Sequence, residues 1–326
     1  MSFATQNSRH GHGNIHCNTN NQPCPPSLRK FSFSKGDKMN KKLPTLTYGI
    51  IGLGIMGGSI SKAIRTNIGG TIYALDKNED SLSEALSQKV IDKGFTPDQT
   101  EEMLSHCDFV FICLYPHATL DFLRQHKTHY KENAIITDIS GVKSLLDKEI
   151  ESLRPSNAHL ILGHPMAGGA KEGYKASKGE YFNNRNYIII NHKGHSHNQE
   201  ALELFKTLIH KMGFTKITET DASTHDNKLG FTSQLCHVVA SAMVESAPDP
   251  EITSFGGGSY EDLTRIAMIN APLWTELFLS NKEKLLDHIE NFKNQISIIE
   301  DFIKNDDSEG LKTILEDVRK KRIQMN

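Results

Sequence analysis

The sequence predicts an α/β domain with a mostly parallel sheet, followed by an all-helical C-terminal domain. Between residues 46 and 220, short apolar and β-branched runs alternate with segments of helical spacing, as in strand–helix–strand units. After Thr220 the strand signals stop and long helical periodicities follow. A glycine-rich turn separates the first run from the first helical segment. We therefore expect a tail over residues 1–45, the α/β domain over 46–220 and the helical domain over 221–326.

Composition narrows the class of protein. The 326 residues are enough for two sizeable cores, and 37 basic against 39 acidic residues give no reason to expect a nucleic-acid or membrane partner. No apolar run is long enough to span a bilayer. The 5 cysteines form an odd and scattered set, which fits a reducing compartment better than a disulfide framework. We expect a cytoplasmic protein.

The first 45 residues predict a disordered tail. They are rich in Asn, Ser, His, Gly and Pro, contain one acidic residue, Asp37, and show no periodicity and no secretory h-region. Two alternatives stay open, a transit segment and a translation start at Met39. Five potential metal ligands of the tail lack the spacing of a zinc site, so a polar tail is preferred. They are His10, His12, His16, Cys17 and Cys24.

A run at Leu46–Ile51 ends in the turn Gly52-Leu53-Gly54-Ile55-Met56-Gly57, and a helical pattern follows. In this strand–turn–helix context the glycine spacing predicts a Rossmann-type dinucleotide site. Gly52 turns the chain, Gly54 lets the backbone approach a pyrophosphate, and Gly57 allows close helix–strand packing. The phosphates would then face the unpaired N–H groups of the helix N-terminus.

Asp76 extends this prediction to the choice of cofactor. It ends the next run, Thr71–Leu75, about 20 residues past the turn, where an acidic side chain accepts hydrogen bonds from the ribose and repels a 2′-phosphate. This favours NAD over NADP; the alternative is a structural turn with a surface Asp. The predicted cofactor contacts are Gly52, Gly54, Ile55, Met56, Gly57, Asp76, Tyr115 and Pro116.

Three more apolar runs predict further parallel strands, each followed by a polar or turn-forming segment. Ligands of open α/β sheets bind beyond the carboxyl ends of the strands, so these segments should gather over the nicotinamide. The strands are Asp108–Leu114, Ala134–Asp138 and His159–Leu162, followed by Tyr115-Pro116, Ser140-Gly141 and Gly163-His164-Pro165.

Two later runs, Asn186–Ile190 and Thr215–Thr218, are expected to extend the same sheet, with a helix from Glu200 to Met212 between them. Three histidines near this region lack metal-ligand spacing and are interpreted as part of a polar loop. They are His192, His195 and His197.

His164 is the most informative candidate for chemistry. Gly163 before it permits close approach, and Pro165 after it fixes its own φ and pushes His164 into an extended conformation. This holds an imidazole, the side chain that titrates near neutral pH, at a fixed point.

The helical half offers further candidates. Arg265 on a mostly apolar face needs an anion, either a buried acidic side chain or a ligand carboxylate. His237, among apolar neighbours, is by itself most simply a core histidine, while His225 and Asp226 either orient each other or lie on a solvated face. Asp262 is interpreted as a capping or supporting residue and Trp274 as core. Helices are expected over Asp221–Glu245, from Tyr260, over Glu276–Ile303 and over Glu309–Met325, and their apolar faces indicate a homodimer.

From about Leu46 to Arg322 the chain resembles the prephenate dehydrogenases, a tyrosine-pathway family that includes arogenate dehydrogenases. Three segments after the turn carry the resemblance: Gly163–Gly168 (GHPMAG), Ser233–His237 (SQLCH) and Gly258–Ala267 (GSYEDLTRIA). The resemblance implies NAD-dependent oxidative decarboxylation of prephenate to 4-hydroxyphenylpyruvate, CO2 and NADH, without a metal. The residues outside the resembling region are too few for a fused catalytic or regulatory domain, so we expect a monofunctional enzyme.

The resemblance also implies roles for single residues. His164 matches the catalytic histidine, which takes the proton of the ring hydroxyl as hydride leaves. Arg265 matches the substrate-binding arginine, whose planar fork suits a carboxylate. His237 matches a histidine near the substrate side chain and favours prephenate over arogenate.

Two departures from the family pattern stand beside these roles. Many members carry Gly-Ser before Val-Lys, and that serine hydrogen-bonds the catalytic histidine. Here the order is Ser140-Gly141, so Ser140, the predicted helper, stands one residue away. Glu261 occupies a position that is often basic, which weakens attraction of a dianion and keeps arogenate dehydrogenase as an alternative.

Two other functions stay open. β-Hydroxyacid dehydrogenases share the Gly52–Gly57 pattern and use a lysine in the helix after the Rossmann domain, for which Lys228 is available, but His164 would then have no task. A non-catalytic NAD(H)-binding protein would bind the cofactor without turnover and would not depend on Arg265.

Overall fold

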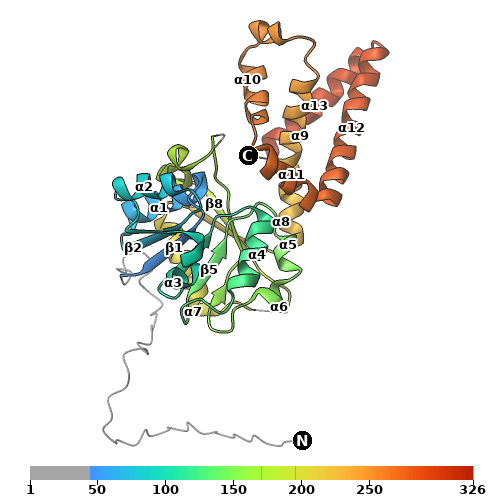
Figure 1. Cartoon of the computed structure of the whole chain (residues 1–326). Coiled ribbons are helices and arrows are strands. Elements are labelled where there is room, and N and C mark those ends of the chain that lie inside the picture. Colours follow the sequence, from blue (N-terminus) through green and yellow to red (C-terminus); the bar gives the residue numbers. More distant parts are fainter. Residues whose placement is uncertain (1–44, 170, 195, 326) are drawn as a thin grey trace, which may run out of the picture. The chain divides into compact units, whose positions relative to one another are not determined.

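The structure, a computed structural model, describes residues 45–169, 171–194 and 196–325. The expectations for the tail, including its candidate metal ligands, and for His195 lie outside these residues. The predicted fold class is confirmed: a parallel sheet with helices is followed by a helical C-terminal segment (Figure 1).

The first sheet has six parallel strands in the order β3-β2-β1-β4-β5-β6. The order reverses between β1 and β4, so a crevice opens at the carboxyl ends of these two strands. The strands are β1 (Thr47–Ile51), β2 (Thr71–Leu75), β3 (Lys93–Phe95), β4 (Phe109–Ile112), β5 (Ile135–Asp138) and β6 (His159–Leu160). The helices are α1 (Ile55–Asn67), α2 (Glu79–Ser87), α3 (Thr100–Leu104), α4 (Pro116–His126), α5 (Ser144–Asp147) and α6 (Ile150–Leu153).

The remaining strands form a second, three-stranded sheet, so the expectation that they extend the first sheet is wrong. Its strands are β7 (Gly163–Pro165), β8 (Asn186–Ile190) and β9 (Lys216–Thr220), with α7 (Gln199–Lys211) between β8 and β9. β7 is antiparallel to β8, and β8 is parallel to β9.

The chain changes sheets between Ile161 and Leu162. The Ile161 N–H donates to the Ile136 carbonyl of the first sheet (2.8 Å), whereas the Leu162 carbonyl accepts from Ile190 of the second (2.9 Å). The predicted strand His159–Leu162 is therefore cut short. His164 lies inside β7, opposite Ile188, rather than in a loop beyond a strand.

The helical segment begins directly after β9. The predicted helix Asp221–Glu245 is α8 (Ala222–Leu229) and α9 (Leu235–Glu245) with a π-helical turn, Gly230–Gln234, between them. The predicted single helix Glu276–Ile303 is wrong, because α11 (Ala271–Ser280) ends before α12 (Lys282–Lys304) begins. The other helices are α10 (Gly258–Thr264) and α13 (Ser308–Gln324), and the short 3-10 turns are Pro97–Gln99, Tyr174–Ala176, Gly179–Phe182, Pro250–Phe255 and Arg265–Ala267.

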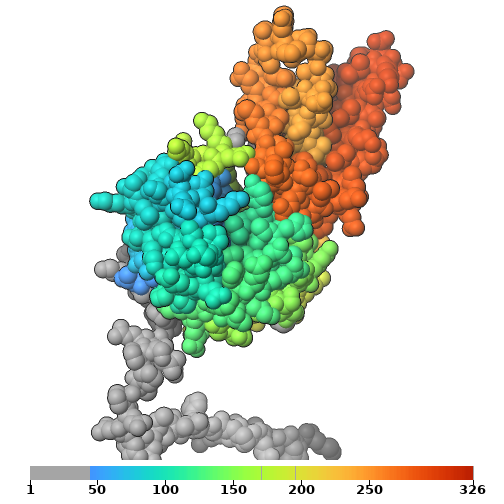
Figure 2. Space-filling model, in the orientation of Figure 1, coloured from blue at the N-terminus to red at the C-terminus, as the bar shows by residue number. Residues whose placement is uncertain are grey.

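The helical segment (yellow-orange to red in Figure 2) carries most of the exposed large apolar side chains of the described residues. Apart from Leu86 and Tyr115, every exposed large apolar side chain of the described residues lies between Phe231 and Met325. Within the described residues, no helix has both the length and the apolar character that a membrane span requires.

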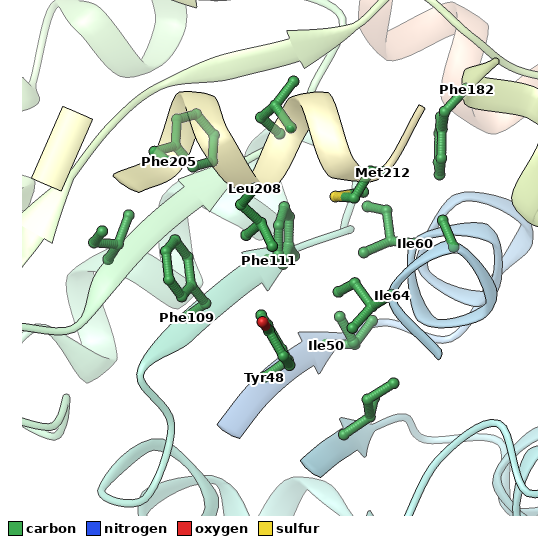
Figure 3. Close-up of a cluster of buried hydrophobic side chains, with 14 of the residues drawn as sticks. Tyr48, Ile50, Ile60, Ile64, Phe109, Phe111, Phe182, Phe205, Leu208 and Met212 are labelled. Carbon is green, nitrogen blue, oxygen red and sulfur yellow. The ribbon is translucent and has the colours of Figure 1, made fainter. Parts of the chain in front are cut away.

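The main core lies where α7 covers the first sheet (Figure 3). Phe205 of α7 is fully buried, and its ring meets that of Tyr187 on β8 edge-on, with centroids 5.6 Å apart. The same cluster holds Phe109 and Phe111 of β4. Both sheets therefore share one core, which fixes β7 and His164 relative to the nucleotide-binding strands.

We expect Phe205→Ala to lower the free energy of unfolding by about 3–5 kcal/mol, because the large buried side chain leaves a cavity between the sheets. Urea denaturation followed by circular dichroism measures this change. Glu203→Ala, an exposed position on the same helix, is the control and should change it by no more than about 0.5 kcal/mol. Equal effects of the two substitutions would contradict the shared core.

Candidate active site

The turn after β1 has the geometry of a dinucleotide site. Gly52 has φ +90, a conformation that favours glycine. A Cβ on Gly57 would stand 1.9 Å from the Gly52 carbonyl oxygen, so close helix–strand packing requires glycine there. A Cβ on Gly54 would meet no protein atom within 4 Å. Packing within the protein therefore does not require glycine at position 54, and the open space beside it leaves room for a ligand to approach the backbone.

Two further features complete the cofactor site. No side chain caps the N-terminus of α1, so its N–H groups remain available for phosphates. Asp76 accepts hydrogen bonds from the N–H groups of Leu53 (2.5 Å) and Asn78 (2.8 Å), which leaves lone pairs for ribose hydroxyls. Together the turn and the carboxylate have the features expected of a dinucleotide-binding site.

The segment after β4 also borders the crevice. Tyr115 is the N-cap of α4 and is 40% exposed, and Pro116 is the first residue of that helix. The His117 N–H of the same first turn donates to Glu276 of α11 at 2.5 Å. This contact joins the start of α4 to the helical segment.

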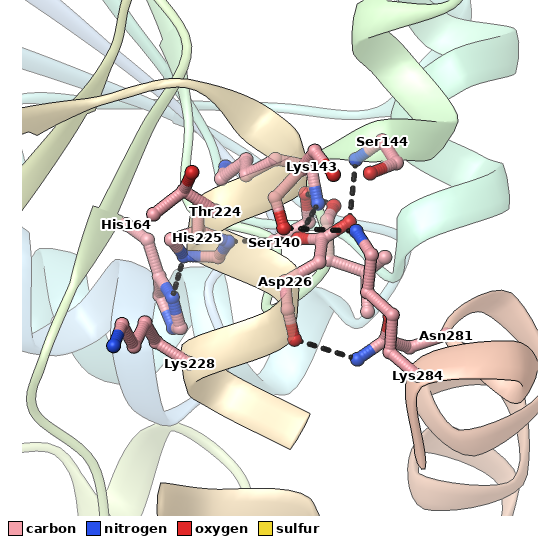
Figure 4. A network of polar contacts seen from close by, with 12 residues as sticks. Ser140, Lys143, Ser144, His164, Thr224, His225, Asp226, Lys228, Asn281 and Lys284 are labelled. Carbon is pink, nitrogen blue, oxygen red and sulfur yellow. Dashed lines mark hydrogen bonds and ion pairs between the residues drawn. The ribbon is translucent and has the colours of Figure 1, made fainter. Parts of the chain in front are cut away.

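His164 takes part in a chain of three side chains (Figure 4). Its Nδ1 lies 3.0 Å from Nε2 of His225, and Nδ1 of His225 lies 2.8 Å from Oδ1 of Asp226. His225 and Asp226 are buried, whereas His164 keeps some exposed surface. Gly163 allows this placement because a Cβ there would stand 2.5 Å from the Tyr187 hydroxyl.

The hydrogen bonds from His164 to His225 and from His225 to Asp226 fix the tautomer of both imidazoles. A carboxylate only accepts, so Nδ1–H of His225 donates to Asp226, and the Nε2 of the neutral His225 ring accepts. Nδ1–H of His164 therefore donates to His225. This leaves Nε2 of His164 as an unprotonated atom that can take a proton.

Both imidazoles are held neutral. Burial lowers the pKa of His164 well below its ordinary value, with further lowering by His225 and Lys143 and opposition from Asp226. Burial also lowers the pKa of His225, although the hydrogen bond that His225 donates to Asp226 opposes the shift. Burial alone would raise the pKa of Asp226, but hydrogen bonds from His225 and Ser144 bring it below its usual range. The result is a neutral base with an ionised carboxylate behind it.

The structure does not bring the Ser140 hydroxyl to His164. That hydroxyl donates to Asp138, and it lies 3.3 Å from the Val142 carbonyl. Gly141 is the residue beside the histidine, because a Cβ there would lie 3.9 Å from Cε1 of His164 and 3.1 Å from Leu277. Within the described residues, the hydrogen-bond partner of His164 is His225.

The candidate substrate residues lie on the helical segment. The His237 ring stacks on Trp274 with centroids 3.6 Å apart, and its Nδ1–H donates to the Ser233 carbonyl. Arg265 is exposed, and it forms no ion pair with another described residue. A buried acidic partner for Arg265, one of the two alternatives, is therefore not found among the described residues. Glu261 and Lys228 are exposed as well.

Comparison with known proteins identifies the family. Sequence models described as "Prephenate dehydrogenase, nucleotide-binding domain" and "Prephenate dehydrogenase, dimerization domain" match residues 60–218 and 221–317. The chain is 31% identical over 283 residues to a prephenate dehydrogenase of Lactococcus lactis subsp. cremoris, covering 84% of this chain and 75% of that protein. It is 29% identical over 283 residues to a prephenate dehydrogenase of Bacillus subtilis, covering 84% of this chain and 74% of the relative.

The chain belongs to the prephenate dehydrogenase family. Its structure is also similar to that of a prephenate dehydrogenase from Aquifex aeolicus in complex with hydroxyphenyl propionate and NAD+, with a TM-score of 0.78 and 29% identity. The match covers 88% of this chain and all of that one. The chain is thus an oxidoreductase of the prephenate dehydrogenase family, as predicted.

The sequence predicts Ser140 as the helper of His164, whereas the structure places His225 at that position. The sequence allows His225 and Asp226 either to orient each other or to lie on a solvated face. The structure shows them buried and hydrogen-bonded to each other. The signal was a His-Asp pair at the start of the first helix after the sheet. Lys143, which is fully buried, was not singled out.

We expect Gly54→Ala and Gly57→Ala to differ in how they lose NAD+ binding. Gly54→Ala should keep the melting temperature within a few degrees but weaken NAD+ binding at least tenfold, because its methyl group occupies the place of the pyrophosphate. Gly57→Ala should lower the melting temperature as well, because its Cβ collides with the Gly52 carbonyl. Calorimetric titration and thermal denaturation measure both effects. Wild-type NAD+ affinity in Gly54→Ala would contradict this assignment.

Proposed function

We propose that this chain catalyses the NAD+-dependent oxidative decarboxylation of prephenate to 4-hydroxyphenylpyruvate, CO2 and NADH. The observation that carries the proposal is the unprotonated Nε2 of His164, held by His225 and Asp226. Bound NAD+ supplies the hydride acceptor. Loss of CO2 makes the ring aromatic, so the reaction needs no metal as an electron sink.

In this proposal His164 is the general base. Its Nε2 accepts the proton of the ring hydroxyl as hydride leaves the carbon that bears this hydroxyl, and its Nδ1–H remains hydrogen-bonded to His225. The Asp226 carboxylate stabilises the positive charge that then develops on the imidazoles. General base catalysis of this kind contributes roughly 100- to 10,000-fold to the rate.

The helical segment supplies the proposed substrate contacts. Arg265, which has no acidic partner among the described residues, is available for a substrate carboxylate through its planar fork. His237, held by Trp274 and the Ser233 carbonyl, is proposed to lie near the substrate side chain. Ser140 is proposed to act on the loop through Asp138 rather than on His164.

We also propose a homodimer formed through the helical segment. The exposed apolar side chains between Phe231 and Met325 support it, as does the match of residues 221–317 to a dimerization domain. A cytoplasmic location is proposed on the odd number of cysteines, of which Cys107, Cys113 and Cys236 are free in the described part of the chain.

Purified protein mixed with NAD+ and prephenate should produce NADH, followed at 340 nm, and turnover with arogenate should be slower.

His164→Asn should keep NAD+ affinity and lose roughly 100- to 10,000-fold in kcat, because the base is removed. NAD+ binding without turnover of either substrate would favour the non-catalytic alternative. Near-normal turnover by His164→Asn would rule out His164 as the base.

Arg265→Lys should raise KM for prephenate roughly tenfold or more with a smaller change in kcat, because lysine keeps the charge but loses the bidentate fork. KM for NAD+ should not change. Arg319→Lys, at another exposed arginine of the helical segment, is the matched control. An unchanged KM for prephenate in Arg265→Lys would refute the carboxylate contact.

A further inference from the structure

Lys143 is a charged side chain buried without any exposed surface, within the hydrogen-bonded network that holds the proposed base. Its Nζ lies 2.5 Å from Oδ2 of Asp138, which is fully buried too. Its backbone N–H donates to Oδ1 of Asp226 at 2.8 Å. Lys143 therefore binds two buried carboxylates: Asp138 through its side chain, and Asp226 through its main chain (Figure 4).

Each of these carboxylates also fixes one side of His164. Oδ1 of Asp138 accepts from the Gly163 N–H (3.2 Å), which precedes His164 in β7. Asp226 holds His225, the hydrogen-bond partner of His164. Lys143 thus binds both carboxylates that hold His164: Asp138, which binds the backbone N–H before it, and Asp226, which binds its partner His225.

A purely structural role does not account for this pair. Removing two charges from water costs several kcal/mol each, and replacing a buried ion pair with apolar residues is often neutral or stabilising. Apolar side chains would fill the same volume without that cost. Stability alone therefore gives little reason for a buried lysine in this network, and its links to the supports of His164 suggest a role in positioning that histidine.

We propose that Lys143, anchored by Asp138, is a positioning residue of the reaction that keeps His164 in place and uncharged before the substrate hydroxyl binds. This inference rests on the proposed function of His164 as the base. Because the Lys143 ammonium is ion-paired with Asp138, Lys143 affects the reaction through His164 rather than by contacting the substrate.

The charges around His164 support this role. His225, Asp226 and the exposed Lys228 come from α8, Asp138 ends β5, and Lys143 precedes α5. The Leu277 side chain of α11, which adjoins Gly141 on this side, carries no charge. Lys143 lowers the pKa of His164 in addition to the effects of burial and His225, whereas Asp226 raises it. Lys143 therefore offsets the carboxylate that would otherwise favour the protonated histidine.

The test measures the titration of His164 itself in Lys143→Met and in the double variant Asp138→Asn/Lys143→Met. The Cε1–H resonance of His164, assigned by its loss in His164→Asn, is followed by NMR against pH in the apo protein. The pH dependence of kcat/KM for prephenate is measured in parallel. Lys148→Met, at an exposed lysine of the same segment, is the matched control.

The wild-type resonance should titrate below pH 6.5. Lys143→Met should shift its midpoint upward by about one unit or more, the scale of a nearby charge. The acid limb of kcat/KM should move upward equally, because the base must be neutral to act. The double variant leaves no unpaired buried charge and serves if Lys143→Met fails to fold; its midpoint should also move upward, but by less, because the opposing charge of Asp138 is removed too. Lys148→Met should leave the midpoint unchanged.

Two results would overturn the inference. The first is a wild-type midpoint at or above 6.5, and the second is a midpoint that does not move in whichever Lys143 variant folds. A packing role alone would lower stability and kcat without moving the midpoint. Absence of turnover by the wild type would contradict the proposed function, whereas the NMR titration would still decide the role of Lys143.

Discussion

The carboxylate of Asp226 is the contact on which the arrangement of the site depends. It accepts from the N–H groups of Lys143 and Ser144 and from the His225 ring, at 2.8 Å each. The backbone carbonyl of the same residue accepts from Asn281 between α11 and α12 (2.8 Å). One residue thus joins the loop after β5, the His164–His225 pair and the junction between α11 and α12. Because these groups are buried, each unsatisfied partner would cost about 1–3 kcal/mol, so the network favours a single arrangement.

Local patterns predicted the cofactor half of the site. The roles of Gly52, Gly57 and Asp76 follow from spacing along one strand–turn–helix unit, so the chemistry is contained in about thirty consecutive residues. His164 was found for a similar reason, since glycine and proline on either side restrict the backbone. His225 could not be assigned in this way. It lies 61 residues away in sequence, and the contact exists only because β7 leaves the first sheet.

The errors in the predicted fold have the same origin. The apolar run His159–Leu162 looks continuous, but its hydrogen bonds pass from Ile136 to Ile190 within two residues. The helical period of the sequence continues through Asn281, but the helix is interrupted there because the Asn281 side chain donates hydrogen bonds to both Asp226 and Gln234. Gln234 in turn donates to the Leu277 carbonyl and closes the π-helical turn against α11. Tertiary hydrogen bonds of this kind leave no periodic signal in the sequence.

The electrostatics of the site follow from the balance of its buried charges. A histidine next to a carboxylate is ordinarily easier to protonate, and Asp226 acts in that direction on both imidazoles. Burial opposes it, and so does the ammonium of Lys143. Since the net shift of the pKa is downward for His164 and His225, the pair stays neutral while the carboxylate stays ionised. When Nε2 of His164 accepts a proton, it creates a positive charge on the histidine pair. The Asp226 carboxylate therefore stabilises the pair most after the proton has moved.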